Sequence, residues 1–209
     1  MPRLTTRLLL LPLLLALAAC GSERDSSTDV DGAAPEEARV GLAIGSTAPE
    51  LVGINSWINS EPLTLAGQFE ANRVVLIDVW TYTCSNCIHT LPYVRGWHEK
   101  YADRGLTIIG VHTPEFSFEA DRDNVIEAAQ RLGVTYPIAQ DNDWQTWRAL
   151  NNRYWPALYL VGVDGAVRYQ HFGEGQYDEI ERQIRDALTE AGHDISDIPL
   201  GGIATQQAS

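Results

Sequence analysis

The sequence has few positive charges for its length. Its 209 residues include 15 Lys and Arg against 28 Asp and Glu, which gives a formal net charge of −13 at pH 7. Nucleic-acid binding depends largely on Lys and Arg placed against the phosphate backbone, so this balance argues against a nucleic-acid partner. It also argues against electrostatic attraction to the negatively charged head groups of a membrane.

The sequence also lacks an apolar run long enough to cross a membrane comfortably. A spanning helix needs about 20 apolar residues, whereas the longest run here is Leu8–Ala19, and Pro12 interrupts it. Arg3 and Arg7 precede this run. A short apolar stretch after positive charges is typical of a secretory signal, so we interpret residues 1–19 as a signal peptide and expect an exported protein.

Cysteine is scarce, with three in the whole chain. The first, Cys20, follows Leu17-Ala18-Ala19, and this tetrapeptide resembles a bacterial lipobox, which implies cleavage before Cys20 and lipidation of that residue. An ordinary signal peptide that happens to contain a cysteine is the alternative. Residues 20–40 are mostly small or acidic and have little to bury, so we expect a lipidated cysteine and a disordered tether. The protein is then extracytoplasmic and anchored to a bacterial membrane by its acyl chains.

The other two cysteines, Cys84 and Cys87, open a helical pattern directly after the apolar run 74–80. Residues three apart in a helix lie on one face within about 5–6 Å, which lets a disulfide open and close with little backbone movement. The first cysteine sits where backbone N–H groups and the helix dipole favour a thiolate. The spacing therefore predicts Cys84 as the nucleophile and Cys87 as the resolving thiol.

The rest of the chain predicts one α/β domain over residues 41–192, with a mixed sheet between helices and a flexible tail over 193–209. Apolar runs predict strands and 3.6-residue periodicity predicts helices. The Asp164-Gly165 pair favours a tight turn between two strands. The expected elements are an amino-terminal hairpin within 48–65, strands at 74–80, 106–111 and 136–138, helices at 84–104, 121–132, 144–151 and 177–191, and a hairpin at 157–172.

Four segments carry a resemblance to a known family. They are residues 80–87 (Trp-Thr-Tyr-Thr-Cys-Ser-Asn-Cys), 110–116 (Gly-Val-His-Thr-Pro-Glu-Phe), 152–157 (Asn-Arg-Tyr-Trp-Pro-Ala) and 172–175 (Phe-Gly-Glu-Gly). The chain resembles the thioredoxin superfamily, in particular its TlpA-like extracytoplasmic thiol–disulfide oxidoreductases, and most of all the thioredoxin-like domain of DipZ-type proteins. The resemblance implies a thioredoxin-like sandwich, with an inserted helical segment, that exchanges disulfides with protein substrates.

The resemblance also implies roles for single residues. Asp78 matches a buried acid that accepts the proton of the resolving cysteine, with a polar residue at an edge or a local hydrogen-bond anchor as the alternative. Trp80 matches a tryptophan beside the active site, with a plain core residue as the alternative. Trp155 and Pro156 match a cis-proline loop that faces the cysteines and receives the substrate chain. Pro92 matches the proline that kinks the active-site helix.

The resemblance implies no bound cofactor, because the dithiol of the cysteine pair itself carries two electrons. The implied partner is a membrane electron-transfer protein of the DipZ or CcdA type, which resets the pair. Ser85 and Asn86 replace the Gly-Pro of thioredoxin and affect the redox potential. His89 lies after the cysteines instead of between them, which favours a reductase or isomerase-type role over a strong oxidase.

Three other interpretations remain open from the sequence. A copper chaperone of this fold uses two cysteines and a histidine, but such proteins usually separate their cysteines by three residues. A thiol peroxidase needs a threonine and an arginine around its thiolate, and no suitably placed arginine accompanies Thr81 and Thr83. A permanent disulfide is disfavoured because so tight a loop stabilises little. We therefore expect no metal site and favour disulfide exchange.

Overall fold

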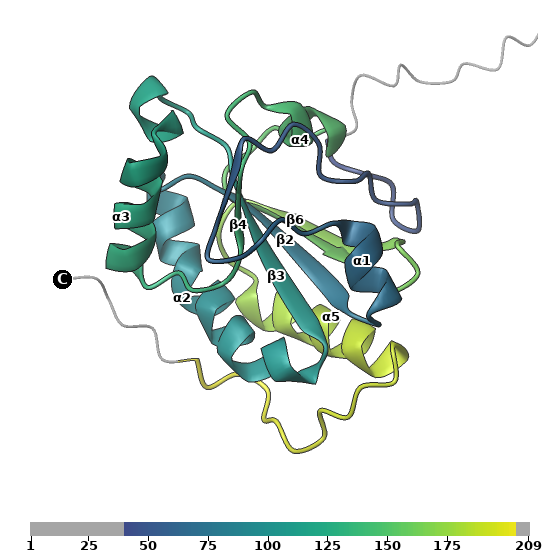
Figure 1. The fold of residues 1–209 in the computed structure, drawn as a ribbon. Coiled ribbons are helices and arrows are strands. Elements are labelled where there is room, and N and C mark those ends of the chain that lie inside the picture. Colours follow the sequence, from purple (N-terminus) through teal and green to yellow (C-terminus); the bar gives the residue numbers. More distant parts are fainter. Residues whose placement is uncertain (1–39, 204–209) are drawn as a thin grey trace, which may run out of the picture. The chain divides into compact units, whose positions relative to one another are not determined.

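The computed structural model describes residues 40–203, which form a six-stranded sheet with helices on both faces (Figure 1). The strand order is β1-β4-β3-β2-β5-β6. In chain order the elements are β1 (Ser56–Ile58), α1 (Leu65–Glu70), β2 (Val74–Trp80), α2 (Ser85–Tyr101), η2 (Ala102–Arg104), β3 (Leu106–His112), η3 (Ser117–Ala120), α3 (Arg122–Leu132), β4 (Ile138–Gln140), α4 (Gln145–Ala149), β5 (Ala157–Val161), β6 (Val167–Phe172) and α5 (Tyr177–Glu190). Within the described residues, no helix has both the length and the apolar character needed to cross a membrane.

The centre of the sheet consists of the two apolar runs that the sequence identifies as strands. β2 and β3 pair in parallel, and every residue of both strands is buried. β4 extends the parallel part beside β3, whereas β5 pairs with β2 in the antiparallel direction. β5 and β6 form the predicted hairpin. The mixed sheet and the α/β fold class expected from the sequence are confirmed.

Alternation along the strands divides the core into two layers, because successive side chains of a strand point to opposite faces. On one face Leu76 and Trp80 pack with buried residues of α2, α3 and α5. On the other face Ile77 and Val79 pack with buried residues of α1 and α4. Asp78 shares the parity of Leu76 and Trp80 and so lies on the α2 face of the sheet, beneath the helix that carries the cysteines.

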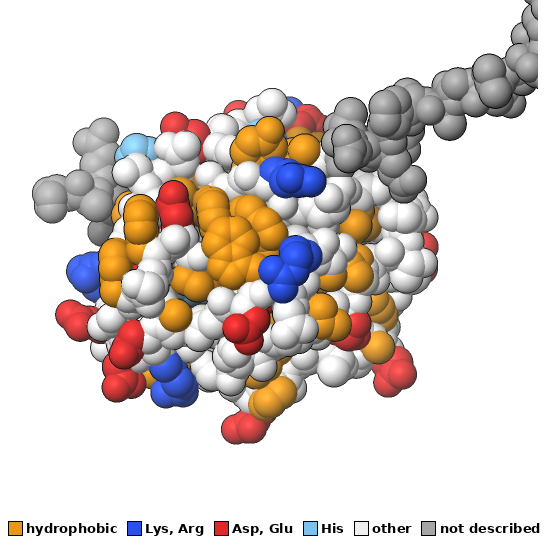
Figure 2. Space-filling view, turned by 90° about the horizontal axis from the view of Figure 1, so that it is seen from above, with side chains coloured by type: hydrophobic (Ala, Val, Ile, Leu, Met, Phe, Trp, Pro, Cys, Tyr) orange, Lys and Arg blue, Asp and Glu red, His pale blue; other side chains and the backbone are white. Residues whose placement is uncertain are grey.

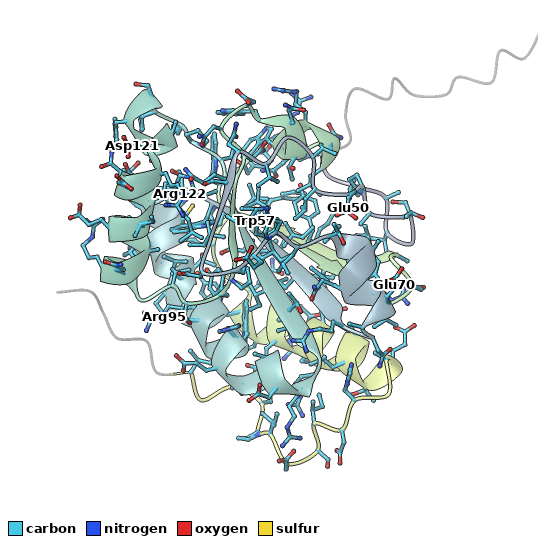
Figure 3. All side chains as sticks on the ribbon, viewed as in Figure 1. Glu50, Trp57, Glu70, Arg95, Asp121 and Arg122 are labelled. Carbon is cyan, nitrogen blue, oxygen red and sulfur yellow. The ribbon has the colours of Figure 1, made fainter. Side chains whose placement is uncertain are left out.

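Local signals set the ends of α2 and α3, two of the helices on this face. Cys84 is the N-cap of α2, and Pro92 lies inside that helix. Asp121, at the start of α3 in Figure 3, accepts hydrogen bonds from the backbone N–H groups of the first turn. Gly133 ends α3 in the left-handed conformation that glycine adopts without strain. Because these caps are visible in the sequence, the predicted helix positions are confirmed to within a few residues.

The predicted amino-terminal hairpin is wrong. β1 pairs in the antiparallel direction with β4, which is far away in the chain, and not with residues 62–65. Thr64 accepts a hydrogen bond from the backbone N–H of Gly67 at 3.1 Å and caps α1, so the second half of the expected hairpin begins a helix. Residues 59–64 therefore connect strand β1 to helix α1 instead of forming a turn between two strands.

The stretch before β1 runs beside the other edge of the sheet. Thr47 forms an isolated antiparallel bridge with Ala166. On one side of the bridge the Val167 N–H donates to the carbonyl of Ser46 at 2.9 Å, and on the other side the Ala48 N–H donates to the carbonyl of Gly165 at 2.9 Å. The amino-terminal part of the domain therefore contacts both β4 and β6.

Residues 193–203 are packed against the domain, so the flexible tail predicted from residue 193 is wrong for this part. Ile195 is 5% exposed. The ammonium group of Lys100 on α2 donates to the carbonyls of Pro199 and Gly201 at 2.7 and 3.0 Å. Ile195 and the other apolar residues of this segment do not recur at helix or strand spacing, so their burial could not be predicted from the sequence. The signal peptide at 1–19, Cys20, the tether up to residue 39 and the tail residues 204–209 lie outside the described residues.

Candidate active site

The two cysteines occupy the first turn of α2 and differ in exposure. Cys84 is half-buried with an extended backbone, and its Sγ accepts a hydrogen bond from the backbone N–H of Cys87 at 3.2 Å. Cys87 is 1% exposed, and Ser85 and Asn86 between the two cysteines are exposed. Both thiols are free, so the structure shows the reduced dithiol. A partner disulfide can approach Cys84 from solvent, whereas Cys87 is accessible only from Cys84 and the interior.

The surroundings of the two thiols move their pKa values in opposite directions. Hydrogen bonding to the Cys87 thiol lowers the pKa of Cys84 to about 7, and backbone N–H groups of the helix start contribute against the effect of burial. Burial, and then the neighbouring Cys84, raise the pKa of Cys87 far above its usual value. Near neutral pH Cys84 therefore loses its proton in part, whereas Cys87 keeps its own. The predicted division of roles between the two cysteines agrees with this asymmetry.

Asp78 lies in β2, 1% exposed, on the same face of the sheet as α2. Burial raises its pKa to about 7; a hydrogen bond from Tyr136 opposes this effect and the charge of Cys84 adds to it. The Tyr136 hydroxyl donates to Oδ2 of Asp78 at 3.1 Å. After burial and the neighbouring Cys84, the charge of Asp78 also contributes to the raised pKa of Cys87. A carboxyl that titrates near neutral pH is suited to accept and return a proton there.

The loop before β5 contains the cis peptide bond that the resemblance predicts, between Trp155 and Pro156. Pro156 is buried, and the half-buried Trp155 packs against Trp147 with 4.1 Å between ring centroids. The indole N–H of Trp155 donates to the carbonyl of Thr113 at 3.1 Å, and the Thr113 N–H donates to the carbonyl of Trp80 at 3.1 Å. These bonds place the loop at the end of β2 that leads into the cysteines. That Trp155 and Pro156 bind substrate remains a prediction.

Trp80, for which the resemblance predicts a place beside the active site and a part in substrate binding, is fully buried. Its ring meets the edge of His112 with 5.3 Å between centroids. The alternation of β2 directs this side chain into the core beneath α2, so the core alternative stated for it holds. Trp80 supports the floor of the site without reaching its surface.

Glu119 is a buried carboxyl near the cysteines that sequence reasoning did not identify. It accepts a hydrogen bond from the Thr83 hydroxyl at 2.5 Å and from the backbone N–H groups of Glu115 and Phe116 at 2.7 and 2.9 Å. Burial alone would raise its pKa, but these hydrogen bonds outweigh burial and lower the pKa. Glu119 thus ties the loop after β3 to the residue that precedes Cys84. Nothing in its local sequence distinguishes it from a surface glutamate.

His112 ends β3 and is also fully buried near the site. Burial lowers its pKa to about 4, so the ring is neutral at physiological pH. Its Nε2 lies 3.3 Å from the Thr81 hydroxyl, and its ring stacks on Tyr82 at 5.6 Å between centroids. Tyr82 and Thr81 belong to the segment between β2 and Cys84. A neutral imidazole supports this segment by packing and a hydrogen bond, and it adds no charge beside the thiols.

Exposed aromatic side chains lie next to the segment that leads into the cysteines. Phe116 and Phe118 are 50% and 53% exposed, and their rings stack with centroids 5.7 Å apart. Phe118 also meets Tyr82, two residues before Cys84, at 6.4 Å between centroids. The view from above the fold shows hydrophobic side chains gathered on this face among charged ones (Figure 2). The surroundings of Cys84 therefore offer apolar surface.

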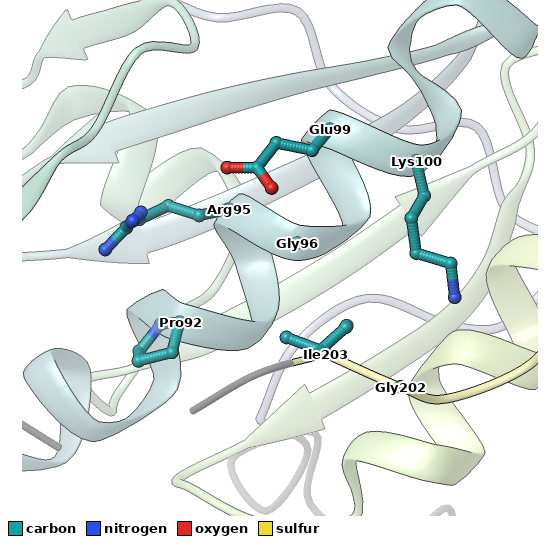
Figure 4. A pocket seen from close by; sticks show the side chains of 7 residues that line it. All are labelled: Pro92, Arg95, Gly96, Glu99, Lys100, Gly202 and Ile203. Atoms are coloured by element: carbon teal, nitrogen blue, oxygen red, sulfur yellow. The ribbon is translucent and has the colours of Figure 1, made fainter. Parts of the chain in front are cut away.

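A groove of about 380 Å³ lies elsewhere, along α2 and the carboxy-terminal segment (Figure 4). Its lining residues are Pro92, Arg95, Gly96, Glu99, Lys100, Gly202 and Ile203. Neither cysteine nor Asp78 belongs to this set, so the groove is separate from the thiols. Within residues 40–203 no group of three or more His, Cys, Asp and Glu side chains is placed to hold a metal ion.

The chain and its fold are similar to several known proteins. The Redoxin family matches residues 43–188. Over 148 residues the chain is 47% identical to Protein DipZ of Mycobacterium tuberculosis, covering 69% of this chain and about a fifth (21%) of that relative. Over 146 residues it is 25% identical to Thiol-disulfide oxidoreductase ResA of Geobacillus kaustophilus, covering 70% of this chain and 79% of ResA. A solved structure of a thioredoxin-like protein in the oxidized form matches with a TM-score of 0.64 at 28% identity, covering 71% of this chain and 99% of that one.

Proposed function

The chain belongs to the Redoxin family, and on this basis we propose that it is a thioredoxin-like thiol–disulfide oxidoreductase that reduces protein disulfides through Cys84 and Cys87. The observation that carries the proposal is the asymmetry of the two thiols above a buried acid. Cys84 is half-exposed and its pKa is lowered to about 7, whereas Cys87 is buried and its pKa is raised. Asp78 beneath them has a pKa of about 7.

The proposed reaction has two exchange steps. The Cys84 thiolate attacks one sulfur of a substrate disulfide; a mixed disulfide forms and the other substrate sulfur leaves as a thiolate. The Cys87 thiol then gives its proton to the Asp78 carboxylate and attacks Sγ of Cys84. The Cys84–Cys87 disulfide forms, the second substrate sulfur leaves, and two electrons have passed to the substrate. The dithiol supplies both electrons, so these steps need no further redox group.

The proposal extends to the location and the partner of the protein. The signal pattern at residues 1–19 and the lipobox-like sequence before Cys20 support an extracytoplasmic domain held at a membrane by a lipid. Each turnover leaves the cysteine pair oxidised, so a donor must reduce it again. The similarity to part of DipZ supports a membrane electron-transfer protein of the DipZ or CcdA type as this donor.

A disulfide-reduction assay tests the proposal. With insulin as substrate and dithiothreitol as electron donor, Cys84→Ser is expected to reduce turnover to the uncatalysed rate. Cys87→Ser retains the attacking thiol and is expected to accumulate a mixed disulfide with the substrate, visible by mass spectrometry. Undiminished turnover in Cys84→Ser, or stoichiometric copper binding by a protein without exchange activity, would contradict the proposal.

The direction of electron flow has its own measurement, the reduction potential of the Cys84/Cys87 couple against glutathione. The reduction potential of a reductase is expected to lie near that of thioredoxin, at about −270 mV. A potential near about −120 mV, as in a strong oxidase, would contradict the reductase role.

A further inference from the structure

The phenol of Tyr136 lies within the core against the carboxyl of Asp78. Its hydroxyl donates a hydrogen bond to Oδ2 of Asp78 at 3.1 Å, and both side chains are almost completely buried. The two residues are 58 positions apart in the chain; Asp78 lies in β2, and Tyr136 lies in the segment that leads into β4. A donor aimed at a buried carboxylate favours its charged form, the form that can accept a proton.

The backbone on both sides of Tyr136 is fixed by other parts of the fold. The side-chain amide of Asn59, just after β1, donates to the carbonyls of Tyr136 and Val134 at 3.2 and 3.1 Å. The carbonyl of the next residue, Pro137, accepts from the Gly110 N–H of β3 at 2.9 Å. The phenol therefore projects from a segment that is held to strands on either side of it.

The path of the ring from this segment to Asp78 depends on Gly110. In the sheet register, Gly110 of β3 stands opposite Asp78 of β2. A Cβ atom at position 110 would lie 3.0 Å from Cε2 of Tyr136 and 2.9 Å from Nε1 of Trp80. A side chain there would push the phenol or the indole away, so the absence of one lets Tyr136 reach across β3 to the acid.

The groups around Asp78 differ in how they interact with it, and Tyr136 is the one whose side chain donates a hydrogen bond to it. From α2 come Cys84 and Cys87, both of which interact with Asp78 electrostatically. The charge of Arg95 on the same helix opposes the rise in the pKa of Tyr136. The centroid of the His98 ring lies 5.8 Å from that of the phenol ring. The residues opposite Asp78 on the neighbouring strands are uncharged, Gly110 and Leu158. Burial raises the pKa of Tyr136 well above its usual value, so the hydroxyl keeps its proton and remains a donor.

We propose that Tyr136 is a positioning residue for the exchange reaction, holding the Asp78 carboxylate in place to receive the proton of Cys87. The inference rests on the proposed function, in which Asp78 is the proton acceptor. Tyr136 itself touches neither the substrate nor the sulfur atoms in this role. It determines how readily Asp78 is ionised at neutral pH, and through this the rate at which Cys87 resolves the mixed disulfide.

The resolving step can be measured separately from the attack by Cys84. Cys84 is first converted to its mixed disulfide with 5-thio-2-nitrobenzoate, and release of the coloured thiol then reports the attack by Cys87 as a function of pH. Tyr136→Phe is expected to move the midpoint of this profile upward by about one to two pH units, since hydrogen bonds to charged groups have this magnitude. The rate at pH 7 is expected to fall about tenfold or more and to recover at higher pH.

Tyr159→Phe is the matched control. Tyr159 is a buried tyrosine of β5 in the core layer on the opposite face, and its hydroxyl lies 3.0 Å from Oδ1 of Asn152. Removing this hydroxyl is expected to leave the midpoint where it is in the wild type. Asn59→Gly releases the backbone of Tyr136 without removing the phenol, and glycine tolerates the positive φ at that position. Its expected effect is a smaller shift in the same direction as Tyr136→Phe.

Asp78→Asn distinguishes a failure of the role assigned to Tyr136 from a failure of Asp78 as the proton acceptor. If Asp78→Asn abolishes the pH dependence while Tyr136→Phe and Asn59→Gly keep the wild-type midpoint, the role of Tyr136 is overturned and Asp78 remains the proton acceptor. If Asp78→Asn leaves the profile unchanged, the proposed acceptor itself is wrong. The double variant Asp78→Asn/Tyr136→Phe is expected to have the same rate of thiol release at each pH as Asp78→Asn. A further change in that rate would contradict the inference.

Discussion

A buried acid such as Asp78 makes the stability of the folded protein depend on pH. Burial raises its pKa from 3.8 to about 7, so the folded state holds this proton more tightly than the unfolded chain. The free energy of unfolding gained from the proton is present at pH 4 and is lost as the pH rises toward 7 and beyond. The carboxyl that suits proton transfer thus weakens the fold at the pH where it works.

Replacing Asp78 by Asn is expected to remove this pH dependence. The difference in the free energy of unfolding between pH 4 and pH 7 should shrink by about 3 kcal/mol relative to the wild type, because most of the effect of the pKa shift falls between these two pH values. Urea unfolding of the reduced protein at both pH values measures it. Asp123→Asn, at an exposed position in the first turn of α3, serves as the control. Equal pH dependence in Asp78→Asn and the wild type would show that the acid titrates normally.

Single residues could be predicted from the sequence when their partners lie close in the chain or in a recognisable motif. Cys84 and Cys87 occupy one helical turn, and the cis bond before Pro156 belongs to a short motif. Tyr136 and Glu119 could not be predicted, because each meets its partner through the fold. Tyr136 reaches Asp78 across β3, and Glu119 reaches Thr83 over 36 positions of the chain.

At the scale of elements, the loop after β3 is held to the start of α2 by one buried carboxylate, that of Glu119. Glu119→Gln removes the charge from hydrogen bonds that come from Thr83 and from two backbone N–H groups. We expect the free energy of unfolding at pH 7 to fall by about 1–3 kcal/mol. The hydrogen bonds lower the pKa of Glu119 against the effect of burial. The loss of stability in Glu119→Gln is therefore expected at pH values above the pKa of this carboxyl in the unfolded chain, and it should diminish as the pH falls.

Glu115→Gln is the control for this variant, since Glu115 lies in the same loop with an exposed side chain. Chemical unfolding of both variants at pH 7 and at acidic pH makes the comparison. Equal stability of Glu119→Gln and Glu115→Gln at pH 7 would contradict the role assigned to the buried carboxylate.

Elements were predictable where a local signal marks them. The Asp-Gly turn indicates the β5–β6 hairpin, and the N-cap Asp121 with Gly133 brackets α3. β1 has only three residues and gains its hydrogen bonds from β4, a strand more than 70 positions later. Its pairing is therefore a property of the assembled sheet, and a local pattern suggested a hairpin instead.

At the scale of the whole domain, the carboxy-terminal segment completes the core beside α2 and α5. Ile195 belongs to the cluster that also contains buried residues of those helices. Buried Glu181 on α5 pairs with Lys100 on α2 and accepts a hydrogen bond from the Gly201 N–H at 3.0 Å. The segment therefore adds both apolar burial and a polar anchor to the helices that flank the active-site face.

Two variants in this segment are expected to differ in stability. Ile195→Ala opens space in the core, and we expect the free energy of unfolding to fall by about 2–4 kcal/mol. Leu200→Ala changes an apolar residue that is 48% exposed and is expected to cost less than about 1 kcal/mol. Thermal or urea unfolding of the two variants measures the difference. Comparable stability of both would show that the segment does not contribute to the core.

The amino-terminal stretch that contacts both β4 and β6 limits how much backbone the two edges of the sheet leave open. An open strand edge is a template on which another chain can add by backbone hydrogen bonds. Here both ends of the sheet finish in short pieces, the three residues of β1 and the single bridge at Thr47, which are poor templates. Another chain therefore finds little open backbone to pair with along either edge of the sheet.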